Sequence, residues 1–535
     1  MRPGGPFRTR AGSLVTTITN PTAVESRSLP TSTAGRPRRR YGDALAITFL
    51  VAAAAALRVE PLGPHSLWID DAWVSLLSKV HSIADVRRVS VASPGFIALL
   101  KLWFSAVGFS NLRAQMPAVI FGILGPPALY VTARAWRLGR PAALLAGGLL
   151  AVSPVHMRYS TRVKAFTLEA LAAAGLLLIA DRLLSAPARR SRWYAFSVAA
   201  ALATTLSAPL VIVCVPGFLA GFVAARRANE RLPRAALGAT AGYGVFSLAW
   251  YAVAIRSAID HNLVEYWRDY YISHRSVGEL LSTTSRGFTR LAHGFAPLPA
   301  VATLLALTAC LVWTTRLRPD RAVLLFGPIV IAAAMAALHR SPFGGNRTDI
   351  YLYSGLALTL ACGTDALFAR IPVRAALGTA LAAIVALGAV SLPVPAYPKE
   401  DVRAMLDIVD TNLHTKDAIL LYPKARFAAA LYTDWPFHLR TPVDGDSVTT
   451  PFDVEIDRPR TFVPLDTVPV HFATAVRRAV SSSRRIWYVG SHGGPDYDRA
   501  GELLSRAGYV LHMRRGFAPH YFLQLWIRPI AKPAP

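Results

Sequence analysis

Long apolar runs alternate with short polar segments along most of the chain. A helix that crosses a bilayer needs about 20 mostly apolar residues, and the pattern predicts eleven such helices. The predicted spans are residues 43–58, 114–134, 141–156, 165–184, 193–207, 209–225, 235–255, 297–315, 322–338, 350–368 and 375–392. We therefore expect a polytopic α-helical membrane protein.

Polar sequence lies on both sides of these runs. Residues 1–40 are rich in Pro, Ser, Thr and Arg, a composition that predicts a disordered basic tail. After the last apolar run, AILLYP, RRIWYVGSHGG and YFLQLWI predict short strands, and PDYDRAGELLSRAG predicts a helix that ends at its glycine. The expected domains are thus the tail, a transmembrane domain over residues 41–392 and a small α/β domain over residues 393–535.

The positions of the arginines orient the predicted helices, because short cytoplasmic loops of membrane proteins concentrate Arg and Lys. With a cytoplasmic N-terminus, every predicted inner loop is rich in arginine. These loops contain Arg134, Arg137 and Arg140; Arg182, Arg189, Arg190 and Arg192; Arg226, Arg227, Arg231 and Arg234; Arg316, Arg318 and Arg321; and Arg370 and Arg374. The stretch 94–109 would invert this order if it crossed, so we expect interfacial helices within residues 66–109. The predicted location is the plasma membrane, with the C-terminal domain outside the cytoplasm.

Composition narrows the class of protein further. The chain has a net charge of +27 although 53% of its residues are hydrophobic, and its arginines are spread between apolar runs. A nucleic-acid partner is not expected, because phosphate backbones are bound by cations gathered on one face. Cys214, Cys310 and Cys362 lie inside apolar runs, which argues against a disulfide framework.

Two adjacent acids follow the first predicted span, in the sequence HSLWIDDAWVSLL. Asp70 and Asp71 occupy the expected first turn of a helix, where carboxylates favour the helix dipole. This structural role is compatible with a chemical one, because a fixed carboxylate can accept the proton of an attacking hydroxyl. We take both as candidate catalytic residues, with Asp70 as the preferred base and Asp71 as the residue that orients either Asp70 or an acceptor.

Cations also gather on the predicted outer side, against the general trend of charge. Loops 156–164 and 339–349 carry five of particular interest. They are Arg158, Arg162, Lys164, Arg340 and Arg347. One interpretation is that single side chains extend toward anionic lipid headgroups. The other is that they converge beside the aspartates and hold the phosphate of a donor, an anion whose geometry suits Arg.

Aromatic residues in the outer segments form a third candidate group. They are Trp68, Tyr159, Tyr266, Trp267 and Tyr270. An aromatic belt at the membrane interface explains them, and a platform that binds the substrate's sugar or lipid is the alternative. A divalent metal held by the aspartates together with His65, His81 or His156 stays open, although no metal-binding spacing is present.

Several motifs resemble those of the GT-C superfamily of membrane glycosyltransferases, in particular the branch with the protein O-mannosyltransferases and the lipid A aminoarabinose transferase. LWIDDAW resembles the acidic pair in that family's first exported loop. SPGFIALLKLWFSAVGFSNLRAQMPAVIFGIL and ALLAGGLLAVSPVHMRYSTRVKAF resemble the stretches that follow it. The family's common Asp-Glu is Asp-Asp here, a form similar to arabinofuranosyltransferases of mycobacterial cell walls. Its Arg-x-Tyr is Lys164-Ala165-Phe166 here.

The resemblance implies an inverting glycosyltransferase that uses a polyprenyl-phosphate sugar as donor. It implies a hydroxyl of a cell-envelope glycan, lipid or protein as acceptor, with mannosyl or arabinofuranosyl transfer as the expected reactions. Two alternatives stay open. A transporter would place ionisable residues near the membrane midplane. The predicted spans are nearly free of acids, and Glu169, about a turn inside the span 165–184, is the main exception. A non-catalytic homologue would bind polyprenyl lipid for a partner complex.

Overall fold

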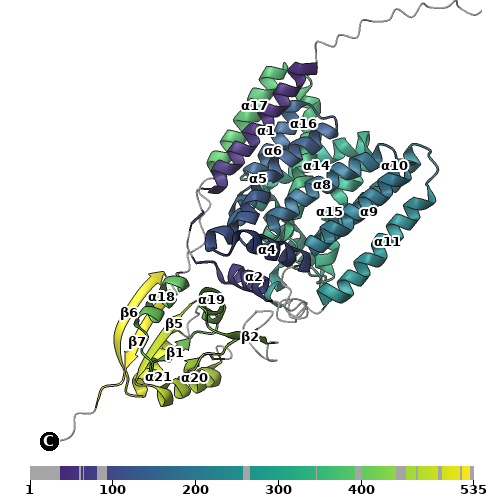
Figure 1. The fold of residues 1–535 in the computed structure, drawn as a ribbon. Helices are drawn as coiled ribbons and strands as arrows, with labels where there is room; N and C mark the ends of the chain where they lie inside the picture. Colours follow the sequence, from purple (N-terminus) through teal and green to yellow (C-terminus); the bar gives the residue numbers. More distant parts are fainter. Residues whose placement is uncertain are drawn as a thin grey trace, which may run out of the picture. The chain divides into compact units, whose positions relative to one another are not determined.

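The computed structural model describes most of the chain (Figure 1). The described residues are 36–59, 62–63, 66–80, 93–256, 265–344, 346–391, 401–440, 453–464, 468–491, 497–518 and 521–530. The predicted tail lies outside this part of the chain, except that residues 36–40 belong to a helix. His65 and His81 also lie outside the described residues.

The chain divides into two compact units, Met1–Ala44 and Leu45–Pro535. The described part of the first unit is the beginning of helix α1 (Arg36–Val59). All other described elements belong to the second unit.

Apolar helices make up most of the second unit, and each of the eleven predicted spans overlaps one of them. After α1 they are α5 (Asn111–Ala135), α6 (Arg140–Ala151), α8 (Phe166–Leu184), α9 (Arg190–Leu206), α10 (Val211–Arg227), α11 (Arg234–Trp250), α14 (Ala300–Leu317), α15 (Pro319–Ala337), α16 (Ile350–Phe368) and α17 (Val373–Ser391). Ala and Leu recur throughout them, and both residues have high helix propensity.

By length and composition, eight helices in the described part of the chain could cross a membrane. They are Tyr41–Val59, Asn111–Ala135, Ala208–Arg227, Arg234–Ile255, Ala300–Leu317, Pro319–Ala337, Arg347–Phe368 and Val373–Ser391. The other three predicted spans differ from these: α6 and α9 have 12 and 17 residues, and α8 carries Glu169, Asp181 and Arg182. The predicted polytopic helical fold is confirmed, although these three helices are shorter or more charged than a typical span.

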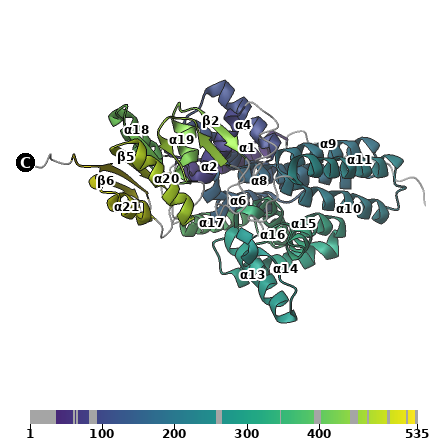
Figure 2. The ribbon, with the colours of Figure 1, turned by 90° about the horizontal axis from the view of Figure 1, so that it is seen from below.

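The core of the helical domain lies among α5, α6, α8 and α16, where Tyr130 and Tyr353 are buried. Helices α9, α10 and α11 lie side by side (Figure 2). Close approach of α6 and α17 depends on Gly148, because a Cβ atom there would clash with the side chain of Ile384. The domain is therefore held by ordinary close packing of small and aromatic side chains.

Short helices lie between the longer ones, and most of them hold predicted site residues. They are α2 (Ile69–Lys79), α4 (Pro94–Val107), α7 (Pro154–Arg158) and the one-turn helices η2 (Tyr159–Thr161), η6 (Arg268–Tyr270) and η7 (Asn346–Asp349). Helices α2 and α4 lie where interfacial helices are expected. Residues 256–296 lie between the predicted spans 235–255 and 297–315, where no helix is predicted. They nevertheless contain α13 (Val277–Phe295), whose first turn is capped by Ser276. Polar residues interrupt the apolar run of α13, so hydropathy alone does not reveal it.

The C-terminal residues fold into an α/β domain, as predicted. Its elements are α18 (Val402–Asn412), β1 (Ala418–Leu421), α19 (Ala425–Tyr432), β2 (Phe437–Arg440), β3 (Asp453–Ile456), β4 (Thr461–Phe462), α20 (Pro469–Ser482), β5 (Arg485–Gly490), α21 (Tyr497–Arg506), β6 (Val510–Ala518) and β7 (Tyr521–Ile527). The three predicted strands correspond to β1, β5 and β7. The predicted helix is α21, and it is followed by Gly508 in the left-handed region, with φ of 81°.

The larger sheet of this domain has the strand order β4-β1-β5-β7-β6. Strand β1 is parallel to β4 and β5, whereas β7 is antiparallel to β5 and β6. Strands β2 and β3 form a separate antiparallel pair. Both faces of β1 and β5 are buried, which explains why their sequences are apolar without alternation.

Candidate functional site

The acidic pair lies in the first turn of α2, as the sequence predicts. Trp68 occupies the N-cap position and provides no side-chain hydrogen bond, so the two carboxylates complement the helix dipole at this end. Successive residues of an α-helix project about 100° apart. Asp70 and Asp71 therefore face different surroundings, and each contacts its own arginine.

Asp71 is buried and held at both carboxylate oxygens. Its Oδ2 lies 2.6 Å from Nε of Arg162, and its Oδ1 accepts a hydrogen bond of 3.0 Å from the backbone N–H of Val163. Burial raises the pKa of Asp71, while the nearby charges of Arg162 and Lys164 oppose this rise. The contacts fix α2 to the segment that follows η2.

Asp70 is more accessible than its neighbour. Its Oδ2 lies 3.2 Å from Nη1 of Arg347 in η7, and 17% of the Asp70 side chain and 24% of the Arg347 side chain are exposed. The guanidinium of Arg347 also lies over the ring of Trp267, 5.2 Å from its centroid. A longer and more exposed ion pair is easier to open, so Asp70 is the better placed of the two acids to meet a substrate.

Lys164 completes the charged cluster. Its Nζ lies 5.1 Å from the ring centroid of Trp73. Loss of solvation lowers the pKa of Lys164 to about 8, against the attraction of Asp70 and Asp71. Arg162 lies over Trp68, with its Cζ 5.5 Å from the ring centroid.

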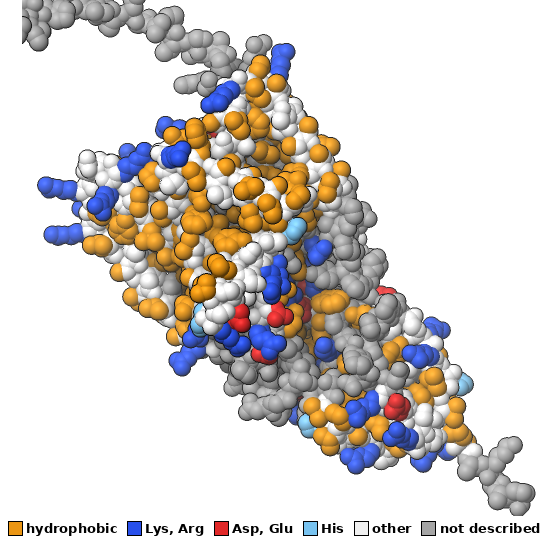
Figure 3. Space-filling model, turned by 180° about the vertical axis from the view of Figure 1, so that it is seen from behind, with side chains coloured by type: hydrophobic (Ala, Val, Ile, Leu, Met, Phe, Trp, Pro, Cys, Tyr) orange, Lys and Arg blue, Asp and Glu red, His pale blue; other side chains and the backbone are white. Residues whose placement is uncertain are grey.

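The cluster of Asp70, Asp71, Arg162, Lys164 and Arg347 brings together residues far apart in the sequence. Its two acids and three bases carry a net charge of +1 when Lys164 is protonated. An anion therefore suits this cluster better than a cation does. On the face shown in Figure 3, acidic and basic side chains gather beside a broad apolar area.

The other predicted site residues have different surroundings. Arg158, in α7, has a buried Nε without a hydrogen-bond partner among the described residues, so it stays a candidate anion ligand. Arg340 is exposed, and its backbone N–H donates to Met335 O. Tyr159 is buried and packs edge-on against Phe166, at 5.2 Å between centroids, which is the environment of a core residue.

Tyr266 and Tyr270 flank Trp267, with ring centroids 5.0 and 5.2 Å from it. Trp267 is therefore the member of this aromatic group that reaches the acidic pair, through Arg347. Arg290 lies over the ring of Tyr270, with its Cζ 4.5 Å from the ring centroid. These rings can form one wall of a binding site beside Asp70.

A buried cation near the end of α1 is not identified from the sequence. Arg58 donates from Nε to Ser160 Oγ at 2.9 Å and from Nη2 to Ala151 O at 3.1 Å, and Nη2 lies 2.8 Å from His156 Nδ1. It thereby ties α1 to the segment that leads into Arg162. A basic residue at the end of an apolar run is typical of a membrane boundary, so the pattern gives no signal for this role.

His156 is one of the histidines considered as a metal ligand, but its Nδ1 contacts the Arg58 guanidinium. Within the described residues, no group of three or more His, Cys, Asp or Glu side chains could hold a metal ion. A metal site built by the chain thus has no support in the part that the structure describes.

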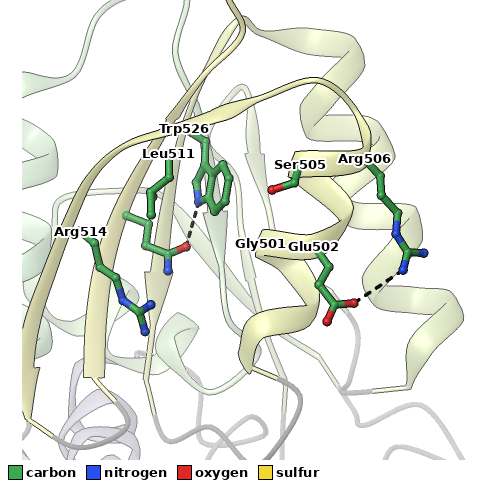
Figure 4. Close-up of a pocket in the computed structure, with 8 residues that line it drawn as sticks. Gly501, Glu502, Ser505, Arg506, Leu511, Arg514 and Trp526 are labelled. Carbon is green, nitrogen blue, oxygen red and sulfur yellow. Dashed lines mark hydrogen bonds and ion pairs between the residues drawn. The ribbon is translucent and has the colours of Figure 1, made fainter.

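A separate hollow of about 430 Å³ lies in the C-terminal domain, between α21 and strands β6 and β7 (Figure 4). It is lined by Gly501, Glu502, Ser505, Arg506, Leu511, Arg514, Gln524 and Trp526. Trp526 Nε1 donates to Gln524 Oε1 at 2.8 Å, and Arg506 pairs with Glu502 at 3.9 Å. None of the predicted site residues belongs to this hollow.

Comparison with known proteins supports the resemblance that the motifs indicate. Residues 91–250 match the model of the family described as dolichyl-phosphate-mannose-protein mannosyltransferase. No curated protein sequence matches the chain.

Solved structures match over most of the chain. ArnT from Cupriavidus metallidurans in the apo state is 14% identical, with a TM-score of 0.54, covering 90% of this chain and 97% of ArnT. The same protein bound to undecaprenyl phosphate gives 13% identity, a TM-score of 0.52 and the same coverage. The archaeal oligosaccharyltransferase AglB from Archaeoglobus fulgidus, in complex with an inhibitory peptide and a dolichol-phosphate, is 12% identical, with a TM-score of 0.47, covering 91% of this chain and 74% of AglB.

Three observations agree with this resemblance. They are the order of the helices, the acidic pair after α1 and the match to ArnT along nearly its whole length. The chain has the fold of the GT-C superfamily of integral membrane glycosyltransferases and is similar to its protein O-mannosyltransferase and aminoarabinose transferase branch.

Proposed function

We propose that the protein is an inverting glycosyltransferase that moves a sugar from a polyprenyl-phosphate donor to a hydroxyl on the outer face of the membrane. The acceptor is a cell-envelope glycan, lipid or protein, and the sugar is mannosyl or arabinofuranosyl. The observation that carries this proposal is the Asp70–Arg347 ion pair beside Lys164 and the buried Asp71–Arg162 pair. ArnT, which has this fold, was solved with undecaprenyl phosphate bound.

The donor phosphate would lie against Arg347 and Lys164. In the donor the phosphate is a diester with one negative charge, and it leaves as a monoester with two. Cations fixed beside the leaving oxygen stabilise the second charge as it develops. Arg158 is a further proposed phosphate ligand because its Nε is buried and unpartnered in the described part of the chain.

Asp70 would act as the general base. The acceptor oxygen forms a bond to the anomeric carbon, the bond from that carbon to the phosphate oxygen breaks, and the acceptor proton passes to Asp70. Attack opposite the phosphate inverts the anomeric configuration. A carboxylate is too weak a base to ionise the acceptor hydroxyl beforehand, so it takes the proton only as the new bond forms. Such assistance contributes about 10²- to 10⁴-fold.

Asp71 would position the site rather than react. Both of its carboxylate oxygens contact other residues, one Arg162 and the other the backbone N–H of Val163. Asp71 therefore fixes the position of α2 relative to the segment that contains Lys164. Asp70 in turn is free to react only when Arg347 turns from it to the phosphate. This exchange would make the donor the first substrate to bind.

The proposed orientation follows from the donor, whose lipid stays in the membrane while its sugar projects from the outer leaflet. The N-terminus is then cytoplasmic, and residues 393–535 form an extracytoplasmic domain. Glu169, the acid that a transporter would use, accepts a hydrogen bond of 2.6 Å from Ser207. This contact gives Glu169 a structural role, and transport gains no support from it.

Substitution of the acids tests the proposal. Purified Asp70→Asn should lose transfer of labelled sugar from a polyprenyl-phosphate donor by about 10²-fold or more. Asp407→Asn should keep full activity, because Asp407 is an exposed residue of α18. Mass spectrometry of envelope glycans from a deletion strain identifies the sugar and acceptor to use. Full activity of Asp70→Asn would show that Asp70 is not the base.

A further inference from the structure

Helix α2 is too short to be stable alone. It has 11 residues and no side-chain cap, and isolated helices of fewer than about 12–15 residues are marginal in water. Eight of its residues are nevertheless buried. The helix that carries the acidic pair is therefore held by its neighbours, and their identity decides how firmly Asp70 is placed.

One neighbour of α2 comes from the C-terminal domain. The ring of Trp73 meets that of Phe427, in α19, edge-on at 6.0 Å between centroids. Side chains of α2, α4, α19 and the sheet belong to one continuous apolar core. The C-terminal domain thus packs directly against the helix that carries the acidic pair.

Polar contacts fix both ends of the same segment. The backbone N–H of Leu67 donates to the hydroxyl of Tyr432 at 2.6 Å. At the other end, Nζ of Lys79 donates to Leu431 O at 2.8 Å. Both partners lie in the last turn of α19, so one turn of that helix holds the beginning and the end of the segment around α2.

Helix α19 is itself firmly anchored. Arg426 and Asp453, in β3, form an ion pair of 2.6 Å, and both side chains are nearly or completely buried. Ahead of α2, the Arg403 N–H donates to Ser66 Oγ at 3.0 Å. The segment from residue 66 to residue 79 is therefore tied to α18 and α19 at three points.

We infer that the C-terminal domain positions the catalytic helix, with Tyr432 and Lys79 as the positioning residues. This inference rests on the proposed function only in its claim that Asp70 is the group being aligned. Arg347 and Lys164 lie outside α2, although they contact it through Asp70 and Trp73. Weakening the hold of α19 should therefore displace Asp70 more than it displaces the phosphate ligands. Transfer slows, while the lipid phosphate still binds.

Tyr432→Phe and Lys79→Met test the inference in the full-length protein in nanodiscs. Tyr432→Phe removes the hydroxyl that binds the Leu67 N–H. Lys79→Met removes the hydrogen bond to Leu431 O together with the cation–π contact to Phe109. Both substitutions keep most of the side-chain volume. Tyr509→Phe is the matched control, because the Tyr509 hydroxyl donates to Ser483 O within the C-terminal domain and does not contact α2. Hydrogen exchange of residues 66–79 is the direct readout, and undecaprenyl phosphate is the binding probe.

Tyr432→Phe should speed exchange of residues 66–79 by about fivefold to tenfold, and kcat should fall by a similar factor. The stoichiometry of undecaprenyl phosphate binding should stay at the wild-type value, which excludes a loss of folded protein, and the affinity should change less than kcat does. The control should change none of these. Unchanged exchange in both variants, or equal changes in the control, would overturn the inference.

Failure of the proposed function would look different. If Asp70→Asn kept full activity while Tyr432→Phe still loosened α2, the contact between α19 and α2 would stand as a structural feature. The activity of Asp70→Asn alone would then reject Asp70 as the base.

Discussion

Arg162 and Asp71 form a nearly buried ion pair, with 2.6 Å between Nε and Oδ2 and less than a tenth of either side chain exposed. Asp70, one residue earlier, forms a longer and more exposed pair with Arg347. Adjacent acids of the same type thus have opposite surroundings, one fixed and one open. This difference separates their proposed roles more clearly than the sequence does.

Arg162→Gln should destabilise the protein by about 3–5 kcal/mol, because it leaves the buried carboxylate of Asp71 without its counter-charge. Thermal or denaturant unfolding in detergent measures the loss. Arg268→Gln is the control, since Arg268 pairs with Glu265 on the surface with both side chains largely exposed. Its effect should stay within about 1 kcal/mol, and an equally small effect for Arg162→Gln would argue against a structural role for the buried pair.

Arg347→Gln should raise the KM for the lipid donor by about tenfold and also lower kcat, because Arg347 is proposed to hold the phosphate as it leaves. Arg347→Lys should change KM and kcat less than Arg347→Gln does, because lysine keeps the positive charge but lacks the forked geometry of the guanidinium. Initial rates with both substrates varied should show that the donor binds first. A variant with normal donor KM would remove Arg347 from the phosphate site.

A chelator should leave transfer activity unchanged. The three bases around Asp70 and Asp71 already supply positive charge where a divalent ion would otherwise act. Activity is to be measured after dialysis against EDTA, and again after addition of Mg²⁺ or Mn²⁺. Loss of activity that either ion restores would show that the reaction needs a metal.

The sequence predicts the helical domain well, because apolar runs of span length have few other solutions. It also predicts the helix beginning at the acidic pair and the strands β1, β5 and β7. It misses α13, in which polar residues break the apolar run, and the cap at Ser276 is the signal that could have found it.

Within the candidate site, the sequence identifies residue types rather than partners. Arg162 and Arg347 are predicted as equivalent phosphate ligands, but long-range packing places Arg162 on buried Asp71. Tyr159 belongs to a cationic loop in the sequence and to the core in the structure. Such differences depend on contacts between residues far apart along the chain, and local patterns do not encode them.

Lys164 should make donor binding depend on pH. Its pKa is lowered to about 8 by loss of solvation, so the side chain is mostly charged below that pH and mostly neutral above it. Binding of undecaprenyl phosphate should therefore weaken as pH rises through about 8, by up to about tenfold per pH unit. In Lys164→Arg the charge persists at every accessible pH, and the weakening should disappear. A pH profile that stays the same in this variant would show that another group titrates, and Lys164 would not be a phosphate ligand.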